Sequence, residues 1–465
     1  MTIKRYFTNL ILKNKTIMSA IMKKRTGVIS LLCLAIWSCK TESTPYISEL
    51  DNPQYYHNSL KQLTDIIVHD IFSPPIASRI YAYSNIAAYE VLVLGYPEYQ
   101  SLANQLNELT PIPAPDTTKQ IDIHLAAIHA FLTVGKALIF SEEKMDAFRE
   151  NLYADFKKGS VPEEIYLPSL AYGEKVAEHI LTWAAKDNYK QTRSMPKYTI
   201  RQDDAYWKPT PPDYMEGIEP HWNKIRPFVL DSASQFKPAP AHKFDMTKGS
   251  PFYKQVMEVY ETGQNLKEES LNIAKFWDCN PYVSHVQGHA MFATKKITPG
   301  GHWMGITGIT TQKAKAGFME TVAAYTMVSI SLFDGFISCW DEKWRSVVIR
   351  PETVINKYVD EDWVPLLQTP PFPEYTSGHS VISNASAEVL TYLYGDNFAF
   401  RDTSEVEYGL PERSFTSFRH AGDEASLSRL YGGIHYRQAI EEGVKQGKKV
   451  GNLVIQQVKI KNNLK

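Results

Sequence analysis

The sequence predicts an all-α protein made of packed helical bundles. Apolar residues recur at steps of three and four over most of the chain, and the alternation typical of strands is scarce. Apolar residues make up 43% of the 465 positions and charged residues 22%, which is the composition of a globular protein. No repeat of solenoid period is evident, so we expect helices that pack around a shared core.

The N-terminus is typical of an export signal. Lys23-Lys24-Arg25 form a basic segment, residues 27–37 form an apolar run, and Ser38 places a small residue before Cys39. This ending resembles the lipobox of bacterial lipoproteins, in which the cysteine is lipidated. We predict a lipoprotein signal over residues 1–38, an anchor on Cys39 as the sole membrane contact, and a periplasmic or surface location in the cell envelope. Plain secretion is the alternative.

Without that segment the chain is acidic. Residues 1–38 contain seven Lys or Arg and no Asp or Glu, so 43 of the 50 basic residues remain against all 51 acidic ones, a net charge of −8. Phosphate backbones bind to accumulated basic surfaces. We therefore expect no nucleic-acid partner, while the oligomeric state is not specified by the sequence.

Residues 39–250 are predicted to form an N-terminal helical region followed by a long crossover. Apolar periodicity predicts amphipathic helices over 119–136, 142–157 and 169–186. Nine prolines between positions 190 and 251 remove amide donors and prevent any long helix there.

Residues 251–460 are predicted to form a second, C-terminal helical domain. The periodicity returns in six segments: 253–263, 267–279, 310–335, 344–358, 378–394 and 437–458. The stripe over 378–394 is the clearest, and Gly395 is a suitable left-handed stop for that helix. This domain also contains Cys279 and Cys339, for which a disulfide is possible and two separate buried thiols are expected.

A pair of cations is the first chemical signal in this domain. Lys343 and Arg350 stand seven residues apart, which is two turns of a continuous helix, so we expect both side chains on one face. Two cations on one face can converge on one anion. Solvated surface helices carry similar pairs, so this signal alone is weak.

The triplet Ser377-Gly378-His379 is the second signal, at the predicted start of the helix over 378–394. Free backbone amides and the helix dipole favour an anion there, Gly378 permits close approach of the backbone, and Ser377 adds a hydroxyl donor. His379 is then a candidate proton donor beside the anion. A plain helix cap is the alternative.

The third signal is the pair Arg429 and His435, six residues apart around two glycines. Gly432 and Gly433 allow the chain to turn, so both side chains can converge on one point. Chance rarely provides Lys-x6-Arg-Pro, Ser-Gly-His and Ser-Arg-x5-His in this order.

Together the three segments resemble the signature shared by the vanadium-dependent haloperoxidases and the type 2 phosphatidic acid phosphatases. The resemblance covers about residues 343–437. It implies an all-helical scaffold of two packed four-helix-bundle halves. It also implies a set of residues that hold a phosphate-like oxyanion: Lys343, Arg350, Ser377, Gly378, Arg429 and His435.

The two families imply different chemistry for the histidines. In a haloperoxidase the cofactor is vanadate, His435 binds the vanadium, and His379 assists hydrogen peroxide in oxidising a halide to a hypohalous species. In a phosphatase His435 is the nucleophile that forms a phosphohistidine, and an Asp four residues later commonly activates it. Ala439 occupies that place here, which favours a haloperoxidase, although Glu441, Glu442 or a distant carboxylate could substitute for that Asp. We predict a haloperoxidase. An exported acid phosphatase is the alternative, and an oxyanion-binding lipoprotein without turnover is a third possibility.

Three aromatic residues are candidate substrate-pocket residues: Tyr282, Trp340 and Phe372. Phe372 precedes Ser377 by five residues, where haloperoxidases carry Phe or His, and Trp340 precedes Lys343 by three. This arrangement most resembles the bacterial iodoperoxidases, and a preference for iodide rests on that resemblance. Core packing is the alternative for each of the three.

Other histidines provide weaker signals. His285 and His289 have the i, i+4 spacing of a metal pair on a predicted helix, but no Glu follows His285 directly as metalloprotease chemistry requires. A zinc site formed by them is therefore disfavoured. We place His302 in a loop, either at the entrance to the site or in a structural role.

Overall fold

The computed structural model describes residues 48, 50–159, 161–287, 290–293 and 295–462, and those from position 50 onward form a single compact unit. Most of the described residues are helical. The described strands form two short antiparallel pairs, β1 (Ser284–Gln287) with β2 (Ala290–Ala293) and β3 (Phe400–Asp402) with β4 (Arg413–Phe415). The all-α prediction is confirmed. The predicted signal and Cys39 lie outside the described residues.

The first bundle consists of α2 (Pro53–His69), α3 (Pro74–Leu92), α4 (Ile123–Ala137), α5 (Glu142–Gly159) and α6 (Glu163–Ala184). The last three correspond to the predicted helices at 119–136, 142–157 and 169–186. We did not predict α2 and α3. Side chains are buried on every side of α3, so its sequence has no polar face to show a helical period. Each of these two helices begins with a capping side chain, Asn52 or Ser73, followed by a proline.

The crossover from residue 185 to 250 contains only two short helical turns, α7 (Tyr189–Thr192) and η2 (Trp222–Lys224). A third short turn, η1 (Val93–Gly95), follows α3 in the first bundle. The crossover is anchored to the core by Asp334. The buried carboxylate accepts hydrogen bonds from the backbone N–H groups of Phe228, Val229 and Leu230 at 2.7–3.0 Å. A buried acid thus satisfies amides that no helix or sheet uses.

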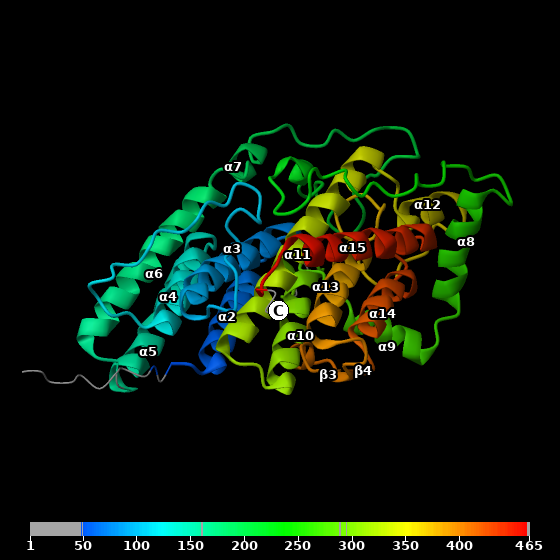
Figure 1. The fold of residues 1–465 in the computed structure, drawn as a ribbon. Helices are drawn as coiled ribbons and strands as arrows, with labels where there is room; N and C mark the ends of the chain where they lie inside the picture. The colour runs from blue at the N-terminus through cyan, green and yellow to red at the C-terminus, as the bar shows by residue number, and fades with distance from the viewer. Residues whose placement is uncertain (1–47, 49, 160, 288–289, 294, 463–465) are drawn as a thin grey trace, which may run out of the picture. The chain divides into compact units, whose positions relative to one another are not determined.

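The second bundle is built around α11 (Phe318–Ser346), which contacts α3 of the first bundle and α13 (Gly378–Tyr394) of the second (Figure 1). α11 is long and apolar enough to cross a membrane by length and composition, but its apolar stretch is entirely buried, as in a core helix. The remaining helical segments are α8 (Pro251–Gln264), α9 (Glu268–Phe276), α10 (Pro299–Ala314), α12 (Pro351–Tyr358), η3 (Val406–Tyr408), α14 (Phe418–Tyr431) and α15 (Arg437–Gln457).

Two predicted helices are interrupted. The segment 310–335 contains the end of α10 and most of α11, separated by Lys315 in the left-handed conformation (φ 53°). The segment 344–358 is divided between α11 and α12, because Val347 is also left-handed (φ 52°) and Pro351 starts a new helix. Apolar periodicity continues across both breaks, so it does not reveal them.

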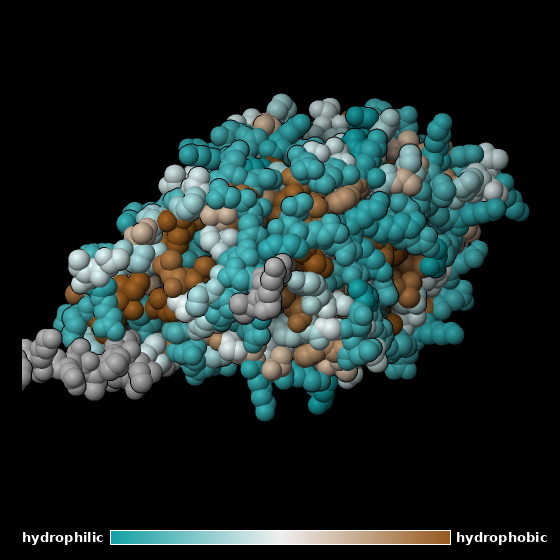
Figure 2. Space-filling model, viewed as in Figure 1, coloured by the Kyte–Doolittle hydropathy of each residue, from teal (hydrophilic) through white to brown (hydrophobic). Residues whose placement is uncertain are grey.

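Glycines allow α15 to lie directly against α13. Gly443, Gly447 and Gly451 are spaced four apart, and a Cβ atom at each would be within 3.0 Å of α13 or the residue that caps it. On the face shown in Figure 2, hydrophilic side chains predominate and apolar ones show in separate patches between them. The close contact between α13 and α15 therefore buries apolar side chains in the interior and fixes the position of the first residues of α13.

Candidate functional site

Lys343 and Arg350 lie close together, but not on one helix face as we predicted. α11 ends at Ser346, and Arg350 is the N-cap residue of α12. The turn between them brings both cations to the ring of Phe372, with Lys343 Nζ and Arg350 Cζ each 5.0 Å from its centroid. The chain reversal, rather than helical spacing, makes them converge.

Backbone carbonyls hold these two cations in place. Lys343 Nζ donates to the carbonyl oxygens of Pro373 (2.9 Å) and Glu374 (3.1 Å), and Arg350 Nε donates to that of Phe372 (2.9 Å). Arg350 Nη2 is buried and has no hydrogen-bond partner among the described residues. One guanidinium donor therefore remains for a ligand.

Ser377, Gly378 and His379 are at the start of α13, as predicted. Ser377 is the N-cap, and its Oγ accepts a hydrogen bond from the N–H of Ser380 at 3.3 Å. Its own N–H donates to the carbonyl of Ala439 on α15. His379 Nε2 is buried without a hydrogen-bond partner in the described part of the chain, so it is available to a molecule in the adjoining cavity.

Arg429 and His435 also lie at this site. Arg429, in the last turn of α14, donates through Nη2 to the carbonyl of Trp277 at 2.6 Å and through Nε to Ser428 Oγ. Gly433 (φ 76°) turns the chain before His435, as the diglycine suggested. His435 Nε2 then lies 3.2 Å from Arg350 Nη1.

Glu374 is a site residue that we did not predict. Its Oε1 lies 2.8 Å from His435 Nδ1 and accepts the N–H of Tyr436 at 2.9 Å. Because the carboxylate accepts, Nδ1 carries the proton and Nε2 presents its lone pair. The detectable signal was an acid in the otherwise uncharged run 369–378, three residues before Ser377.

Glu374 also supplies the carboxylate beside His435 that phosphatases commonly place at the position of Ala439. Ala439 is buried on α15 and supplies no carboxylate, but Glu374 orients His435 in its place. The missing acid at 439 therefore does not distinguish a peroxidase from a phosphatase.

Burial shifts the pKa values of the charged groups strongly. Desolvation lowers the pKa of Lys343 to about 7, that of Arg350 to about 10, and also that of Arg429. Desolvation raises the pKa of Glu374 to about 7, although Arg350 and Lys343 oppose this rise. Lys343 and Arg350 are thus buried beside Glu374, and an added anion would stabilise their charged forms.

Both imidazoles are held neutral. Burial is the largest cause of the lowered pKa of His379 and His435, and neighbouring cations lower both further. A neutral His435 whose Nδ1–H is bound to Glu374 has the form in which histidine binds a metal, with a carboxylate behind it. This donor set, together with the free Arg350 Nη2, fits a metal oxyanion such as vanadate.

A partly open cavity of about 40 Å³ lies beside these groups. Its walls include seven of the ten predicted site residues: Tyr282, Trp340, Phe372, Gly378, His379, Arg429 and His435. Lys343, Arg350 and Ser377 are not among the lining residues. Lys343 instead packs on the ring of Phe372, and Arg350 contacts both Phe372 and His435.

The structure corrects the interpretation of two other histidines. His285 lies in strand β1, so no helix presents it with His289, and His289 lies outside the described residues. His302 is fully buried in α10 rather than in a loop. Cys279 and Cys339 are both buried and unbridged, as expected.

Comparisons with known proteins agree with this geometry. The family model of the VCPO second helical-bundle domain matches residues 323–463. A solved structure described as the first bacterial vanadium-dependent iodoperoxidase is 53% identical in sequence, with a TM-score of 0.85. That match covers 89% of this chain and 98% of the other.

More distant structures share the fold. The holo-type and apo-type structures of a bacterial vanadium-dependent chloroperoxidase are each 16% identical with a TM-score of 0.62. Both matches cover 83% of this chain, and they cover 93% and 94% of the other chains. No curated protein sequence matches this one.

Proposed function

The chain belongs to the vanadium-dependent haloperoxidase family, and on this premise we propose that the cavity lined by His379 and His435 is its active site and that iodide is its preferred halide. The enzyme is an oxidoreductase that uses vanadate as cofactor and acts on hydrogen peroxide and halide. The observation that carries the site assignment is that Arg429 and two neutral imidazoles line one cavity, with Lys343 and Arg350 packed directly behind its wall.

Specific groups of this chain suit each part of vanadate binding. His435 Nε2 is the metal ligand, because Glu374 holds the proton on Nδ1. The charge of the oxyanion is neutralised by Lys343, Arg350 and Arg429, and hydrogen bonds come from Ser377 and the amide of Gly378 at the helix terminus. When bound, vanadate supplies a Lewis acid that activates peroxide toward a halide.

His379 is the acid–base residue of this proposal. Its Nε2 has no partner among the described residues, and its lowered pKa leaves the imidazole neutral and able to accept a proton. Nε2 is therefore placed to accept one proton from hydrogen peroxide that enters the cavity and to return it to the oxygen that leaves as water when the O–O bond breaks. The other oxygen goes to the halide, and one further proton from solvent completes the hypohalous acid and water.

The cavity walls support iodide as the substrate. Trp340 and Phe372 pack against each other with centroids 5.0 Å apart, and Tyr282 lies on the same cavity. An anion entering an aromatic cavity loses hydration, which costs least for a large, weakly hydrated ion. The 53% identical relative is described as an iodoperoxidase, which agrees with this choice.

The test compares halides in the purified protein. We expect peroxide-dependent oxidation of iodide that requires added vanadate, with lower rates for bromide and chloride, and loss of all three in His435→Ala. Equal or faster bromide oxidation would contradict the iodide assignment. Release of phosphate from a monoester by the same preparation, inhibited by vanadate and without halide oxidation, would favour the phosphatase alternative.

We also propose that the enzyme is exported and anchored in the cell envelope through a lipid on Cys39. The basic segment, apolar run and Ser38-Cys39 support this proposal. Cys39→Ala should abolish incorporation of labelled fatty acid and release the protein from the membrane fraction. Retention of the label in that variant would rule out Cys39 as the lipid site.

A further inference from the structure

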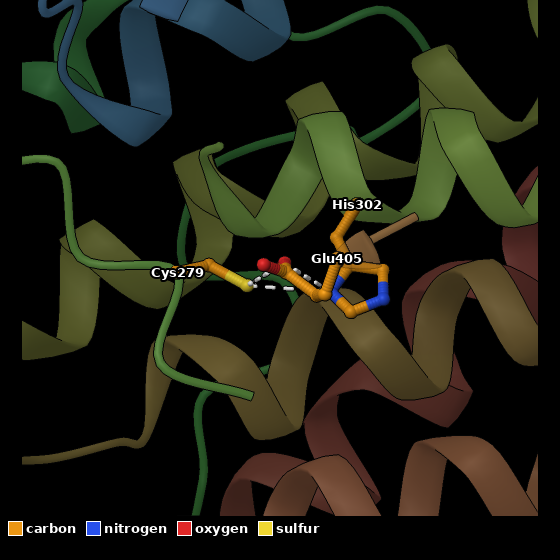
Figure 3. Close-up of side chains that lie close together, drawn as sticks. All are labelled: Cys279, His302 and Glu405. Carbon is orange, nitrogen blue, oxygen red and sulfur yellow. Dashed lines mark hydrogen bonds and ion pairs between the residues drawn. The ribbon is translucent and has the colours of Figure 1, made fainter. Parts of the chain in front are cut away.

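A second cluster of buried reactive side chains lies beside the cavity. Cys279 follows α9, His302 belongs to α10, and Glu405 immediately precedes η3, yet the three side chains face one another (Figure 3). Their exposed fractions are 1%, 0% and 3%. Within the described ranges, no other group of His, Cys, Asp or Glu brings three such ligand atoms together.

The spacing of the three ligand atoms has the dimensions of a metal site. His302 Nδ1 lies 3.3 Å from Cys279 Sγ and 3.2 Å from Glu405 Oε1, and the sulfur and the oxygen are 3.6 Å apart. In tetrahedral zinc sites the metal lies about 2.0–2.3 Å from N, O and S ligands, so neighbouring ligand atoms stand about 3.3–3.6 Å apart. The triangle therefore matches one face of a coordination tetrahedron.

The surroundings of His302 favour ligation through Nδ1. Its Nε2 lies 2.8 Å from Asp402 Oδ2, and Asp402 is itself fully buried. A carboxylate behind the distal ring nitrogen is the usual support of a metal-bound histidine, because it keeps the proton on that nitrogen. Trp277 stacks on the same ring, with centroids 4.6 Å apart and planes inclined by 21°, so the imidazole is held in one orientation.

We propose that Cys279, His302 and Glu405 bind a divalent transition-metal ion of the zinc class, with the fourth position taken by water. One sulfur, one nitrogen and one oxygen ligand suit zinc or cobalt better than magnesium or calcium, which prefer oxygen alone. Glu405 also lines a second cavity with Lys296 and Tyr408, which provides a route of entry separate from the vanadate cavity.

This site would stiffen one wall of the active site. Cys279 lines the vanadate cavity, and Trp277 connects the two sites, because its ring stacks on His302 while its carbonyl accepts the hydrogen bond of Arg429. The proposed metal is distinct from vanadium in its ligands and its charge. Binding of Co²⁺ or Zn²⁺ can therefore be measured without vanadate and without enzyme activity.

The experiment titrates the purified, metal-stripped protein with Co²⁺ and follows absorption. We expect one equivalent to bind, with a thiolate-to-cobalt charge-transfer band in the near ultraviolet and the intense visible bands of tetrahedral cobalt, both displaced by Zn²⁺. Cys279→Ser should abolish the thiolate band. Cys339→Ser, which alters the other buried free thiol, should retain it.

Two further measurements keep the proposal testable if Cys279→Ser does not fold. Asp402→Asn should weaken Co²⁺ binding about 10- to 100-fold without removing the thiolate band. Zinc X-ray absorption of the wild-type protein should show one sulfur among nitrogen and oxygen neighbours. Absence of stoichiometric Co²⁺ binding, or a zinc environment without sulfur, would overturn the proposal.

Discussion

At the level of single residues, the proposed active site depends on ionisable groups whose pKa values are shifted by burial. Lys343 and Arg350 have little carboxylate compensation, and their main partners are neutral carbonyls of the segment 372–374. The carboxylate of Glu374 lies nearby, but among the described residues it accepts from Tyr436 and pairs with His435 rather than with either cation. Lys343 and Arg350 can therefore bind an external anion, which would compensate their buried charge.

Glu374→Gln tests how the metal ligand is oriented. Glutamine keeps the size and one acceptor oxygen, but it removes the negative charge behind His435, so we expect vanadate affinity to fall about 10- to 100-fold while the protein stays folded. Titration of iodide oxidation with vanadate measures the affinity. Glu441→Gln changes an exposed acid on α15 and is the control. Equal affinities in both variants would contradict the role of Glu374.

His379→Ala separates proton transfer from cofactor binding. Removing Nε2 should lower kcat about 10²- to 10⁴-fold and change vanadate affinity much less, because His435 and the cations remain. Steady-state kinetics at saturating vanadate, together with the vanadate titration, distinguish the two effects. A large loss of vanadate affinity at unchanged kcat would instead make His379 a binding residue.

At the level of elements, contact between α13 and α15 positions the anion-binding helix terminus. A Cβ atom at Gly447 would lie 2.1 Å from the carbonyl oxygen of Val381 on α13. The N–H of Ser377 is also bonded to the carbonyl of Ala439 on α15. Separation of these helices would therefore displace the residues that begin α13.

Gly447→Ala tests this contact. Alanine favours an isolated helix, yet here it must push α15 away from α13, so we expect a loss of about 1–3 kcal/mol in the free energy of unfolding and weaker vanadate binding. Denaturant unfolding and vanadate titration measure the two effects. The control is Gly317→Ala, where a Cβ atom would have no neighbour within 4 Å. Similar unfolding midpoints for both variants would show that the helices tolerate the methyl group.

Sequence periodicity predicted α4, α6 and α13, in which apolar residues recur at helical spacing, and missed α2 and α3. α3 is buried on nearly every side, whereas α2 has one clearly buried face that we did not recognise. The convergence of Lys343 and Arg350 was predicted for the wrong reason, since it depends on a left-handed turn at Val347. Glu374 was missed because its partner, His435, is 61 residues away in sequence and only the fold joins them.

At the level of the whole molecule, the two bundles share α11, which contacts α3 on one side and α13 on the other. Lys343 lies near the end of this helix, so its ammonium is buried at the meeting point of the core and the active site. Charge at that position affects global stability as well as binding, because the folded protein must desolvate it whenever it is protonated.

The stability of the vanadate-free protein should therefore rise with pH above 7. The folded-state pKa of Lys343 is about 7 and its ordinary value is 10.5. Between these values the unfolded chain binds a proton that the folded chain does not, which favours folding as pH rises; below pH 7 both states are protonated and the burial cost is fully present. The gain across this window is roughly 5 kcal/mol at most.

Comparing the wild-type protein with Lys343→Met separates the contribution of Lys343 to the pH dependence of stability from that of the other ionisable groups. Methionine keeps an unbranched side chain without charge, so the difference in unfolding free energy between variant and wild type should be largest below pH 7 and shrink toward pH 10. Denaturant unfolding at several pH values measures it. Inorganic phosphate bound in the site should keep Lys343 protonated and flatten the wild-type dependence, because the anion replaces the lost hydration. A difference between variant and wild type that does not change with pH would show that Lys343 keeps its ordinary pKa in the folded protein.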